Sequence, residues 1–188
     1  MNADTKPLLR RFDDYEHLRA LLRTTDPSTP RLLLVRGLPG SGKTTISKAL
    51  LAEEPPFYRE HLEADQWMNA AGARTLDPAA FVFQPTVLPA AHRACIATAR
   101  SALQRGLNVI VANTLTTNRE AAPYWNIARE LRLPAVGVLT ATGAYPSIHR
   151  VPEHALAQMR ARWEELSEDV LDREVMRLQR PPSSSYGL

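Results

Sequence analysis

The stretch Gly37-Leu38-Pro39-Gly40-Ser41-Gly42-Lys43-Thr44 matches the pattern G-x-x-x-x-G-K-[S/T] at every fixed position. Glycines in this pattern let the backbone wrap around a phosphate group and turn its N–H groups towards the phosphate oxygens. The lysine reaches the β- and γ-phosphates, and the threonine hydroxyl binds Mg²⁺. We therefore expect a nucleoside triphosphate to be bound by Gly37, Leu38, Pro39, Gly40, Ser41, Gly42, Lys43, Thr44 and Thr45.

The segments on either side supply the strand and the helix that such a loop requires. Residues 32–35 read Leu-Leu-Leu-Val, a continuous apolar run that predicts a strand buried on both faces. A helix is expected after Gly42, through about Ala52, and its positively polarised N-terminus would face the same phosphate.

Strand-like and helical patterns alternate along the rest of the chain. Strands are expected at residues 61–65, 107–112 and 135–141, and helices at 13–23, 89–105, 118–131 and from 152 to 168 or beyond. This alternation predicts an α/β fold: a doubly wound parallel sheet with helices on both faces.

The composition excludes several classes of protein. The length of 188 residues allows one complete domain. The single cysteine, Cys95, rules out an internal disulfide framework and is typical of a reducing compartment. The longest aliphatic run, residues 32–35, is far shorter than the ~20 residues that cross a membrane, and residues 1–16 lack the apolar stretch of a secretion signal. We expect a cytoplasmic protein with no membrane contact.

The acidic residues distinguish a hydrolase from a kinase. Many NTP hydrolases carry an acid after a second apolar strand to hold Mg²⁺, but the strand at 109–112 is followed by the neutral Asn113. Asp65 stands after the strand that follows the phosphate-loop helix, where a carboxylate can take a proton from an incoming hydroxyl and contact a magnesium-bound water. The alternative is that Asp65 caps a helix beginning at Gln66. Position alone favours neither interpretation.

Phosphoryl transfer also needs positive charge on the transferred group, which arginines in mobile segments often supply. Residues 142–151 contain Gly143 and Pro146 and are expected to form a loop that closes over the nucleotide. Arg150 is the candidate within this loop. Arg160 and Arg162 are weaker candidates, because arginines on helices are more often solvated surface charges.

From about Leu32 to Glu165 the chain resembles the polynucleotide-kinase-like family of P-loop kinases. Besides the phosphate loop, the resemblance rests on Ala64-Asp65-Gln66-Trp67; on Ala91-His92 in a helix closed by Gly106; on Val109-Ile110-Val111-Ala112-Asn113-Thr114 with Glu120 and Pro123-Tyr124 after it; and on Ile148-His149-Arg150-Val151-Pro152 followed by Met159, Arg162, Trp163 and Glu164. The resemblance implies that Asp65 is the general base for an acceptor hydroxyl.

The predicted substrate-binding residues are Trp67, Asn113 and Thr114. The alternative for Trp67 is a core aromatic, and the alternative for His92 is a packed or capping residue. Phe57, Phe81, Phe83 and Trp125 are expected in the core.

Three departures from the family pattern bear on the acceptor. Gln66 stands where the family often has a second acid, and Met68 stands where a phage member has an arginine that contacts the substrate's phosphate. Leu115 replaces the usual asparagine after Asn113-Thr114. The net charge of +3 permits phosphate-bearing partners without implying them.

Together these features predict a P-loop kinase that uses ATP and Mg²⁺ and acts on a hydroxyl-bearing substrate, first a polynucleotide 5′-hydroxyl or a nucleotide-like acceptor. A small-molecule kinase for antibiotics or sugars and an ATP-dependent binding module are the alternatives. The predicted catalytic residues are Lys43, Asp65 and Arg150, and the predicted metal ligands are Thr44 and Asp65. Residues 1–30 are expected to form an N-terminal helix and linker, 31–180 the kinase domain and 181–188 a disordered tail. The oligomeric state is left open.

Overall fold

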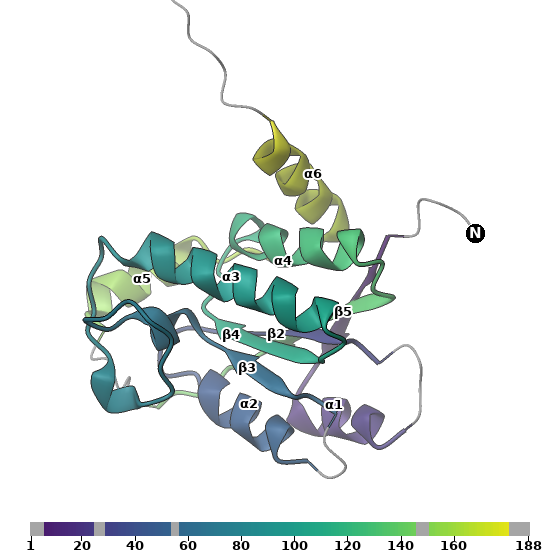
Figure 1. The fold of residues 1–188 in the computed structure, drawn as a ribbon, viewed down its shortest axis with the longest axis horizontal. Helices are drawn as coiled ribbons and strands as arrows, with labels where there is room; N and C mark the ends of the chain where they lie inside the picture. Colours follow the sequence, from purple (N-terminus) through teal and green to yellow (C-terminus); the bar gives the residue numbers. More distant parts are fainter. Residues whose placement is uncertain (1–5, 25–28, 54–56, 146–150, 181–188) are drawn as a thin grey trace, which may run out of the picture.

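A five-stranded parallel sheet forms the centre of the molecule in the computed structural model, which describes residues 6–24, 29–53, 57–145 and 151–180 (Figure 1). The strand order is β1-β5-β2-β4-β3, and every neighbouring pair is parallel. The strands are β1 (Leu8–Phe12), β2 (Leu32–Arg36), β3 (Glu60–Leu62), β4 (Val109–Asn113) and β5 (Ala135–Thr140). The predicted α/β fold with a parallel sheet is confirmed.

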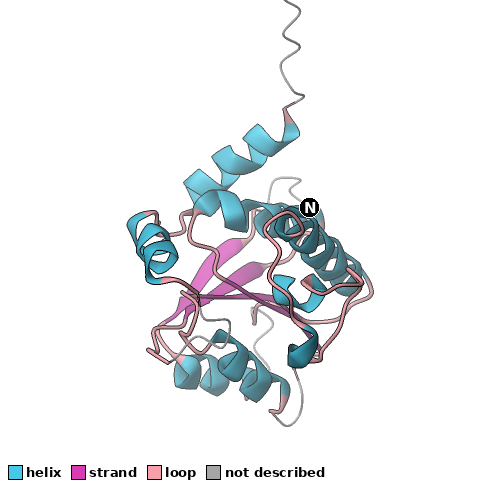
Figure 2. Cartoon of the chain, turned by 90° about the vertical axis from the view of Figure 1, so that its left-hand side faces the viewer, coloured by secondary structure: helices cyan, strands magenta, loops and turns pink. Residues whose placement is uncertain are grey.

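Helices cover both faces of this sheet, as Figure 2 shows from the side. The helices are α1 (Tyr15–Leu22), α2 (Lys43–Leu51), α3 (Leu88–Gln104), α4 (Asn118–Glu130), α5 (Glu153–Ala161) and α6 (Glu168–Gln179), with single turns η1 (Ala64–Trp67) and η2 (Pro78–Ala80). α1 and α2 lie on one face, and α3 and α4 lie on the other (Figure 1). No helix within the described ranges is both long enough and apolar enough to cross a membrane.

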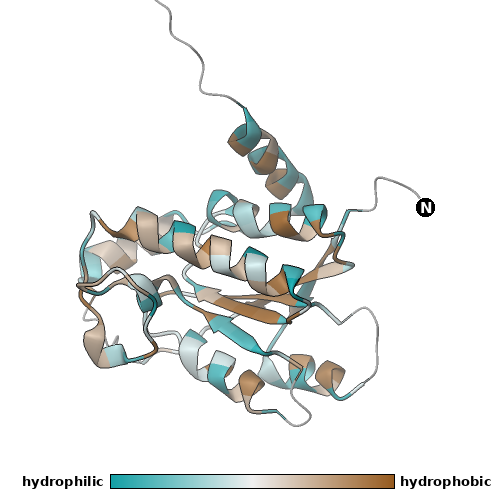
Figure 3. Cartoon of the chain, in the orientation of Figure 1, coloured by the Kyte–Doolittle hydropathy of each residue, from teal (hydrophilic) through white to brown (hydrophobic). Residues whose placement is uncertain are grey.

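The central strands hold the two layers together because both of their faces are apolar. Every residue of β2 and β4 is buried. Successive side chains of a strand point to opposite faces, so Leu32 and Leu34 enter the core beneath α3 and α4, while Leu33 and Val35 enter the core beneath α1 and α2. Figure 3 shows β2 and β4 as the apolar centre between the helical layers. Each fully buried leucine or valine contributes about 1.5–3 kcal/mol relative to an exposed one.

β1 is the element that the sequence analysis did not predict. It pairs in parallel with β5, from Leu8 opposite Ala135 to Phe12 opposite Leu139. Only Phe12 among its five residues is buried, and Leu8 is 65% exposed, so the segment shows no apolar run and no clean alternation. Its position depends on β5, since Leu8 N donates to Pro134 O. Residues 8–12 therefore belong to the same sheet as the phosphate-loop strand.

The single helix expected from residue 152 to 168 or beyond is wrong, because the structure has two helices there. α5 ends at Ala161 and α6 begins at Glu168. Between them Glu164 N donates to Thr116 O (2.8 Å) and Ser167 N donates to Asn118 Oδ1 (2.9 Å). Bonds to the loop between β4 and α4 thus replace the next helical turn, and no local breaker residue signals the interruption. The tail predicted at 181–188 lies outside the described residues.

Candidate active site

The phosphate loop connects the carboxyl end of β2 to the first turn of α2. Gly40 and Gly42 have φ of +80° and +91°, and Gly42 is the N-cap of α2. A Cβ on Gly37 would lie 2.3 Å from Ser41 Oγ and 2.6 Å from Ala141 O. Glycine is therefore required at position 37 for packing and at positions 40 and 42 for backbone conformation. The first amide groups of α2 lie where the loop ends, which is the arrangement that binds phosphate in such loops.

Lys43 curls back over this loop, and its Nζ donates to Leu38 O at 3.0 Å. Burial lowers the pKa of the Lys43 ammonium group, and the negative charges of Glu63 and Asp65 act in the opposite direction. The Lys43 ammonium group thus bonds to the backbone of the loop and is acted on by the charges of two carboxylates. A phosphate oxygen could replace Leu38 O as its hydrogen-bond acceptor.

Thr44 and Glu63 form a short polar contact beside the phosphate loop. Thr44 Oγ1 donates to Glu63 Oε1 at 2.7 Å, and His61 Nε2 lies 3.0 Å from the same oxygen. Burial alone would raise the pKa of the Glu63 carboxyl group, but the close approach of His61, the hydrogen bond from Thr44 and the charge of Lys43 outweigh burial and hold this pKa below its ordinary value. Glu63 is therefore a charged carboxylate beside the hydroxyl of the phosphate loop.

Asp65 lies in the turn η1, three residues beyond the end of β3, and not in the strand expected at 61–65. Glu63 is the N-cap of η1, and Asp65 is within the turn. The alternative in which Asp65 caps a helix beginning at Gln66 is therefore wrong. The charge of Asp65 acts on both Lys43 and His92, so Asp65 is electrostatically coupled to the phosphate loop and to the first half of α3.

His92 and Glu120 approach Asp65 from the helices that cover the other side. Burial lowers the pKa of His92, while the charges of Glu120 and Asp65 act to raise it. Glu120 Oε2 accepts from Thr116 N (2.6 Å) and from Thr116 Oγ1 (3.0 Å), and its Oε1 lies 3.4 Å from Arg162 Nη2. Three titratable side chains, from η1, α3 and α4, thus interact electrostatically with His92 as the common member.

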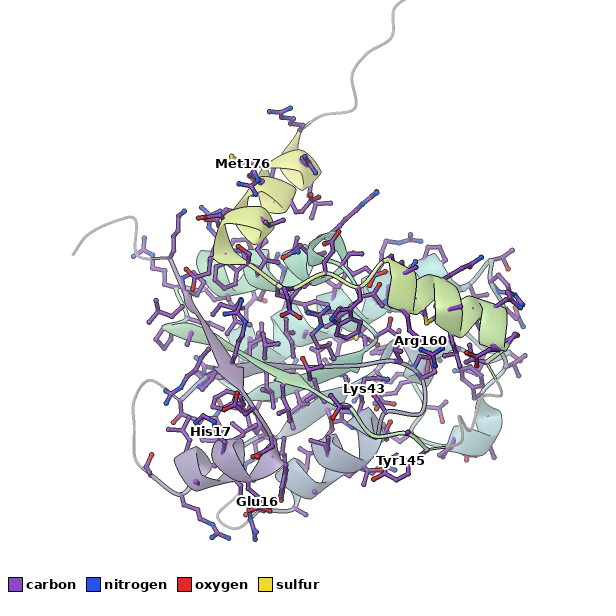
Figure 4. All side chains as sticks on the ribbon, turned by 180° about the vertical axis from the view of Figure 1, so that it is seen from behind. Glu16, His17, Lys43, Tyr145, Arg160 and Met176 are labelled. Carbon is purple, nitrogen blue, oxygen red and sulfur yellow. The ribbon has the colours of Figure 1, made fainter. Side chains whose placement is uncertain are left out.

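The arginine candidates occupy different environments. Arg160 pairs with Glu153 at 2.6 Å on the exposed surface of α5. Arg162, which follows α5, reaches towards the site through its contact with Glu120. Arg150 lies outside the described residues. Figure 4 shows the labels of Arg160 and Lys43 on the same half of the molecule.

The predicted substrate-binding residues are mostly engaged in the fold. Trp67 is 7% exposed within the core, as its core alternative expects, with the Arg74 guanidinium carbon 5.7 Å from the centre of its ring. Asn113 is buried; its Oδ1 accepts from Ala64 N (2.9 Å) and its Nδ2 donates to Tyr124 Oη (3.4 Å). Thr114 O accepts from Gly37 N (3.3 Å). Asn113 and Thr114 thus hold η1 and the phosphate loop against β4.

Two further residues at this end of the sheet, Glu63 and Arg36, were not predicted from the sequence. Glu63 alternates with His61 and Asp65 in the sequence, and a search for every acid near the phosphate loop would have found it. Arg36 ends the apolar strand β2, and an arginine in a buried strand is itself a signal. Its Nη2 donates to Glu164 O (2.9 Å) and Thr116 O (3.3 Å), and its guanidinium carbon lies 4.0 Å from the centre of the Trp163 ring.

The segment after β5 runs along the outer side of the phosphate loop. Ala141 N donates to Arg36 O (2.7 Å), Gly143 N to Ser41 O (3.1 Å) and Tyr145 N to Gly40 O (2.9 Å). These bonds attach residues 141–145 to the loop from the side of the sheet opposite to η1. The phosphate loop is therefore held from both neighbouring strands, by β4 through Thr114 and by β5 through this segment.

Strand, glycine loop and helix in this arrangement define a P-loop nucleotide-binding protein. The chain belongs to the AAA_33 family, whose model is described as an AAA domain and matches residues 32–181. The match begins at the first residue of β2 and thus leaves out β1 and α1.

Solved structures show distant likeness to this fold. One is a chain of the Pnkp1/Rnl/Hen1 RNA repair complex, at 18% identity and a TM-score of 0.43, with 80% of the present chain and 44% of that chain covered. Another is a sugar kinase from a Janibacter species in its unliganded form, at 20% identity and a TM-score of 0.39, with 85% and 83% covered. The present chain thus spans less than half of the repair-complex chain and most of the sugar kinase.

Proposed function

We propose that this protein is an ATP-dependent phosphotransferase that moves the γ-phosphoryl group of ATP to the hydroxyl group of an acceptor. The observation that carries the proposal is the placement of Asp65 in η1, which follows β3 at the same edge of the sheet as the phosphate loop and is bonded to Asn113 of β4 through Ala64 N. At this position the charge of Asp65 acts on the phosphate-loop Lys43 and on His92. A kinase needs its general base close to the bound triphosphate, within reach of the acceptor hydroxyl.

The proposed donor side consists of the phosphate loop, Lys43, Thr44 and Glu63. Lys43 would exchange the carbonyl of Leu38 for phosphate oxygens of the nucleotide. The Thr44 hydroxyl and the charged Glu63 carboxylate are hard oxygen donors 2.7 Å apart, which fits Mg²⁺. Bound Mg²⁺ would neutralise charge on the β- and γ-phosphates. We therefore add Glu63 to Thr44 and Asp65, the metal ligands that the sequence predicted.

The proposed acceptor side consists of Asp65 with His92 and Glu120 behind it. The acceptor oxygen forms a bond to the γ-phosphorus as the bond from that phosphorus to the bridging oxygen of ADP breaks, and the hydroxyl proton passes to the Asp65 carboxylate. Asn113 positions η1, and therefore Asp65, through its bond to Ala64 N. Arg150 keeps its proposed role of stabilising charge on the transferred group.

Two acceptor classes follow from different observations. The resemblance of the motifs supports a polynucleotide 5′-hydroxyl or a nucleotide-like acceptor. Met68 supports a small hydroxyl compound such as a sugar or an antibiotic, because it stands at the family's phosphate-binding position and is only 1% exposed. A buried methionine cannot replace the charge-assisted contact that an arginine makes with phosphate. Arg74, which contacts this turn through Gln66 (2.8 Å), is also bonded to Glu60 (2.6 Å).

The test is transfer of label from γ-labelled ATP to a panel of 5′-hydroxyl DNA, 5′-hydroxyl RNA, nucleosides, sugars and antibiotics. Label on an oligonucleotide selects the first acceptor class, and label on a small compound selects the second. Asp65→Asn should bind ATP as the wild type does and transfer about 10²–10⁴-fold more slowly. The exposed Asp169→Asn on α6 is the matched control. ATP binding with no labelled acceptor would refute the kinase proposal and favour an ATP-dependent binding module.

A further inference from the structure

Tyr145 is an exposed aromatic side chain that is attached to the phosphate loop. The residue is 68% exposed, although its backbone N–H is bonded to Gly40 O at 2.9 Å. Exposed large apolar side chains elsewhere in the described chain lie on other segments: Leu8, Leu76, Val82, Phe83, Met176 and Leu178. Figure 4 shows Tyr145 at the rim of the molecule on the side of Lys43. Neither the fold nor the chemistry described above uses its ring.

Two glycines make room for this ring. A Cβ on Gly143 would lie 2.5 Å from Tyr145 Cε2, and a Cβ on Gly42 would lie 3.3 Å from the same atom. The edge of the ring therefore rests on the backbone of the loop and of the segment bonded to it. Because Gly42 is the residue before Lys43 and the N-cap of α2, the ring is positioned relative to the phosphate site and not relative to the core.

A nucleotide bound in this loop places its triphosphate against the backbone amides, so its ribose and base must lie outside the loop, on a neighbouring surface. Nucleobases bind to aromatic side chains by stacking, and every base has a face that can stack. On the side towards η1 the loop faces the carboxylates Glu63 and Asp65. On the opposite side it is bordered by residues 141–145, which end at the exposed ring.

We propose that the base of the bound nucleoside triphosphate stacks on the ring of Tyr145, with purines favoured because of their larger face. This inference rests on the proposed role of the loop as the site of a nucleotide donor. Tyr145 would then be a specificity residue that contacts the base and leaves the phosphates to Lys43 and the loop amides. Its hydroxyl group has no part in the interaction, so phenylalanine should serve equally well.

The test compares ATP with inorganic tripolyphosphate, which has the phosphates and no base. Both affinities are measured by isothermal titration calorimetry with Mg²⁺ for the wild type, Tyr145→Ala and Tyr145→Phe. Tyr145→Ala should weaken ATP binding about 5- to 50-fold and leave tripolyphosphate binding unchanged, whereas Tyr145→Phe should change neither. The preference for ATP over CTP should shrink in Tyr145→Ala. Phe83→Ala, which removes another exposed aromatic ring (62% exposed), should match the wild type.

Two results would overturn the inference while leaving nucleotide binding intact. Unchanged ATP affinity in Tyr145→Ala would place the base elsewhere. An equal loss for ATP and tripolyphosphate would mean that Tyr145 shapes the loop and does not contact the base. If the wild type bound neither compound, the role of the loop as a nucleotide site would fail, and the stacking proposal would fail with it.

Discussion

Replacing Arg36 by methionine tests how the phosphate-loop strand is tied to the segment between α5 and α6. Arg36 is 1% exposed, and burial lowers the pKa of its guanidinium group, although the charges of Glu165, Glu120 and Glu164 act to raise it. Methionine keeps most of the apolar volume and removes the charge and the donors. The variant therefore isolates the polar contribution of this side chain.

The expected loss follows from the contacts that disappear. The bond to Glu164 O (2.9 Å) is of the charged kind, worth about 1.5–3 kcal/mol, and the cation–π contact with Trp163 at 4.0 Å adds about 2 kcal/mol when desolvated. The bond to Thr116 O is longer, and that carbonyl keeps its bond from Glu164 N. Replacement by methionine also removes the unfavourable free energy of burying the guanidinium group. That group includes Arg36 Nε, which has no hydrogen-bond partner among the described residues. We expect a net loss of about 2–3 kcal/mol in the free energy of unfolding.

Urea denaturation followed by tryptophan fluorescence measures this loss. Arg36→Lys should lose nearly as much, because an ammonium group cannot bond both carbonyls in a plane while stacking on Trp163. The exposed Arg177→Met, which removes a surface pair with Glu174, should change stability by less than about 1 kcal/mol. A stability of Arg36→Met within 0.5 kcal/mol of the wild type, on the order of an ordinary surface substitution, would refute this account of the contact.

Three further predictions concern the loop, the metal and pH. Gly37→Ala should lower ATP affinity at least about 10-fold, because its Cβ would meet the Ala141 carbonyl at 2.6 Å and the loop must shift. Gly72→Ala, at a residue that also has a positive φ (+60°) but has open space around it, is the control for backbone strain, and equal calorimetric ATP affinities of Gly37→Ala and the wild type would contradict this reasoning. Glu63→Gln should raise the Mg²⁺ concentration needed for half-maximal ATP binding about 10- to 100-fold and leave metal-free ATP binding intact, whereas an unchanged Mg²⁺ titration would exclude Glu63 from the metal site. Burial alone would raise the pKa of Asp172, but hydrogen bonds from Lys6 and Trp125 and the charges of Lys6 and Arg129 hold it below its ordinary value. The stabilisation of the fold by the Asp172 carboxylate is therefore complete above the unfolded pKa of about 3.9 and is lost as pH falls through the folded pKa. The difference in Tm between the wild type and Asp172→Asn should shrink below about pH 4. A Tm difference that stays constant with pH would contradict this prediction.

The elements that sequence reasoning predicted are those whose signal is local. β2, β4 and β5 are apolar runs, and α3 ends where Gly106 takes a φ of +86°. The phosphate loop was predicted from its own sequence pattern, and Gly40 and Gly42 in it are required by their positive φ angles. Gly37 is the exception, because the contact that requires it is with Ala141, far away in the sequence. The other features depend on residues that are near one another in the chain.

The missed elements depend on partners far away in the sequence. Residues 8–12 form the strand β1 because they pair with the free edge of β5. The helix breaks between α5 and α6 because the backbone N–H groups of Glu164 and Ser167 donate to Thr116 O and Asn118 Oδ1. In the site, Asp65 was chosen by resemblance, whereas the contact of Glu63 with Thr44 required the turn of η1 to be known. The spacing of residues along the chain does not predict the turn η1.

The edge position of β1 has a consequence for how the molecule is made. Among the described strands β1 comes earliest in the chain, and it pairs only with β5, so it stays without its partner until residues 135–140 have been synthesised. Such a long-range pairing closes late and slowly. Until then, or in a variant from which β1 has been removed, the outer edge of β5 presents unpaired backbone groups that another chain can pair with. An amino-terminal truncation or a bulky fusion at this end should therefore be read first as a risk of aggregation, even though it lies away from the phosphate loop.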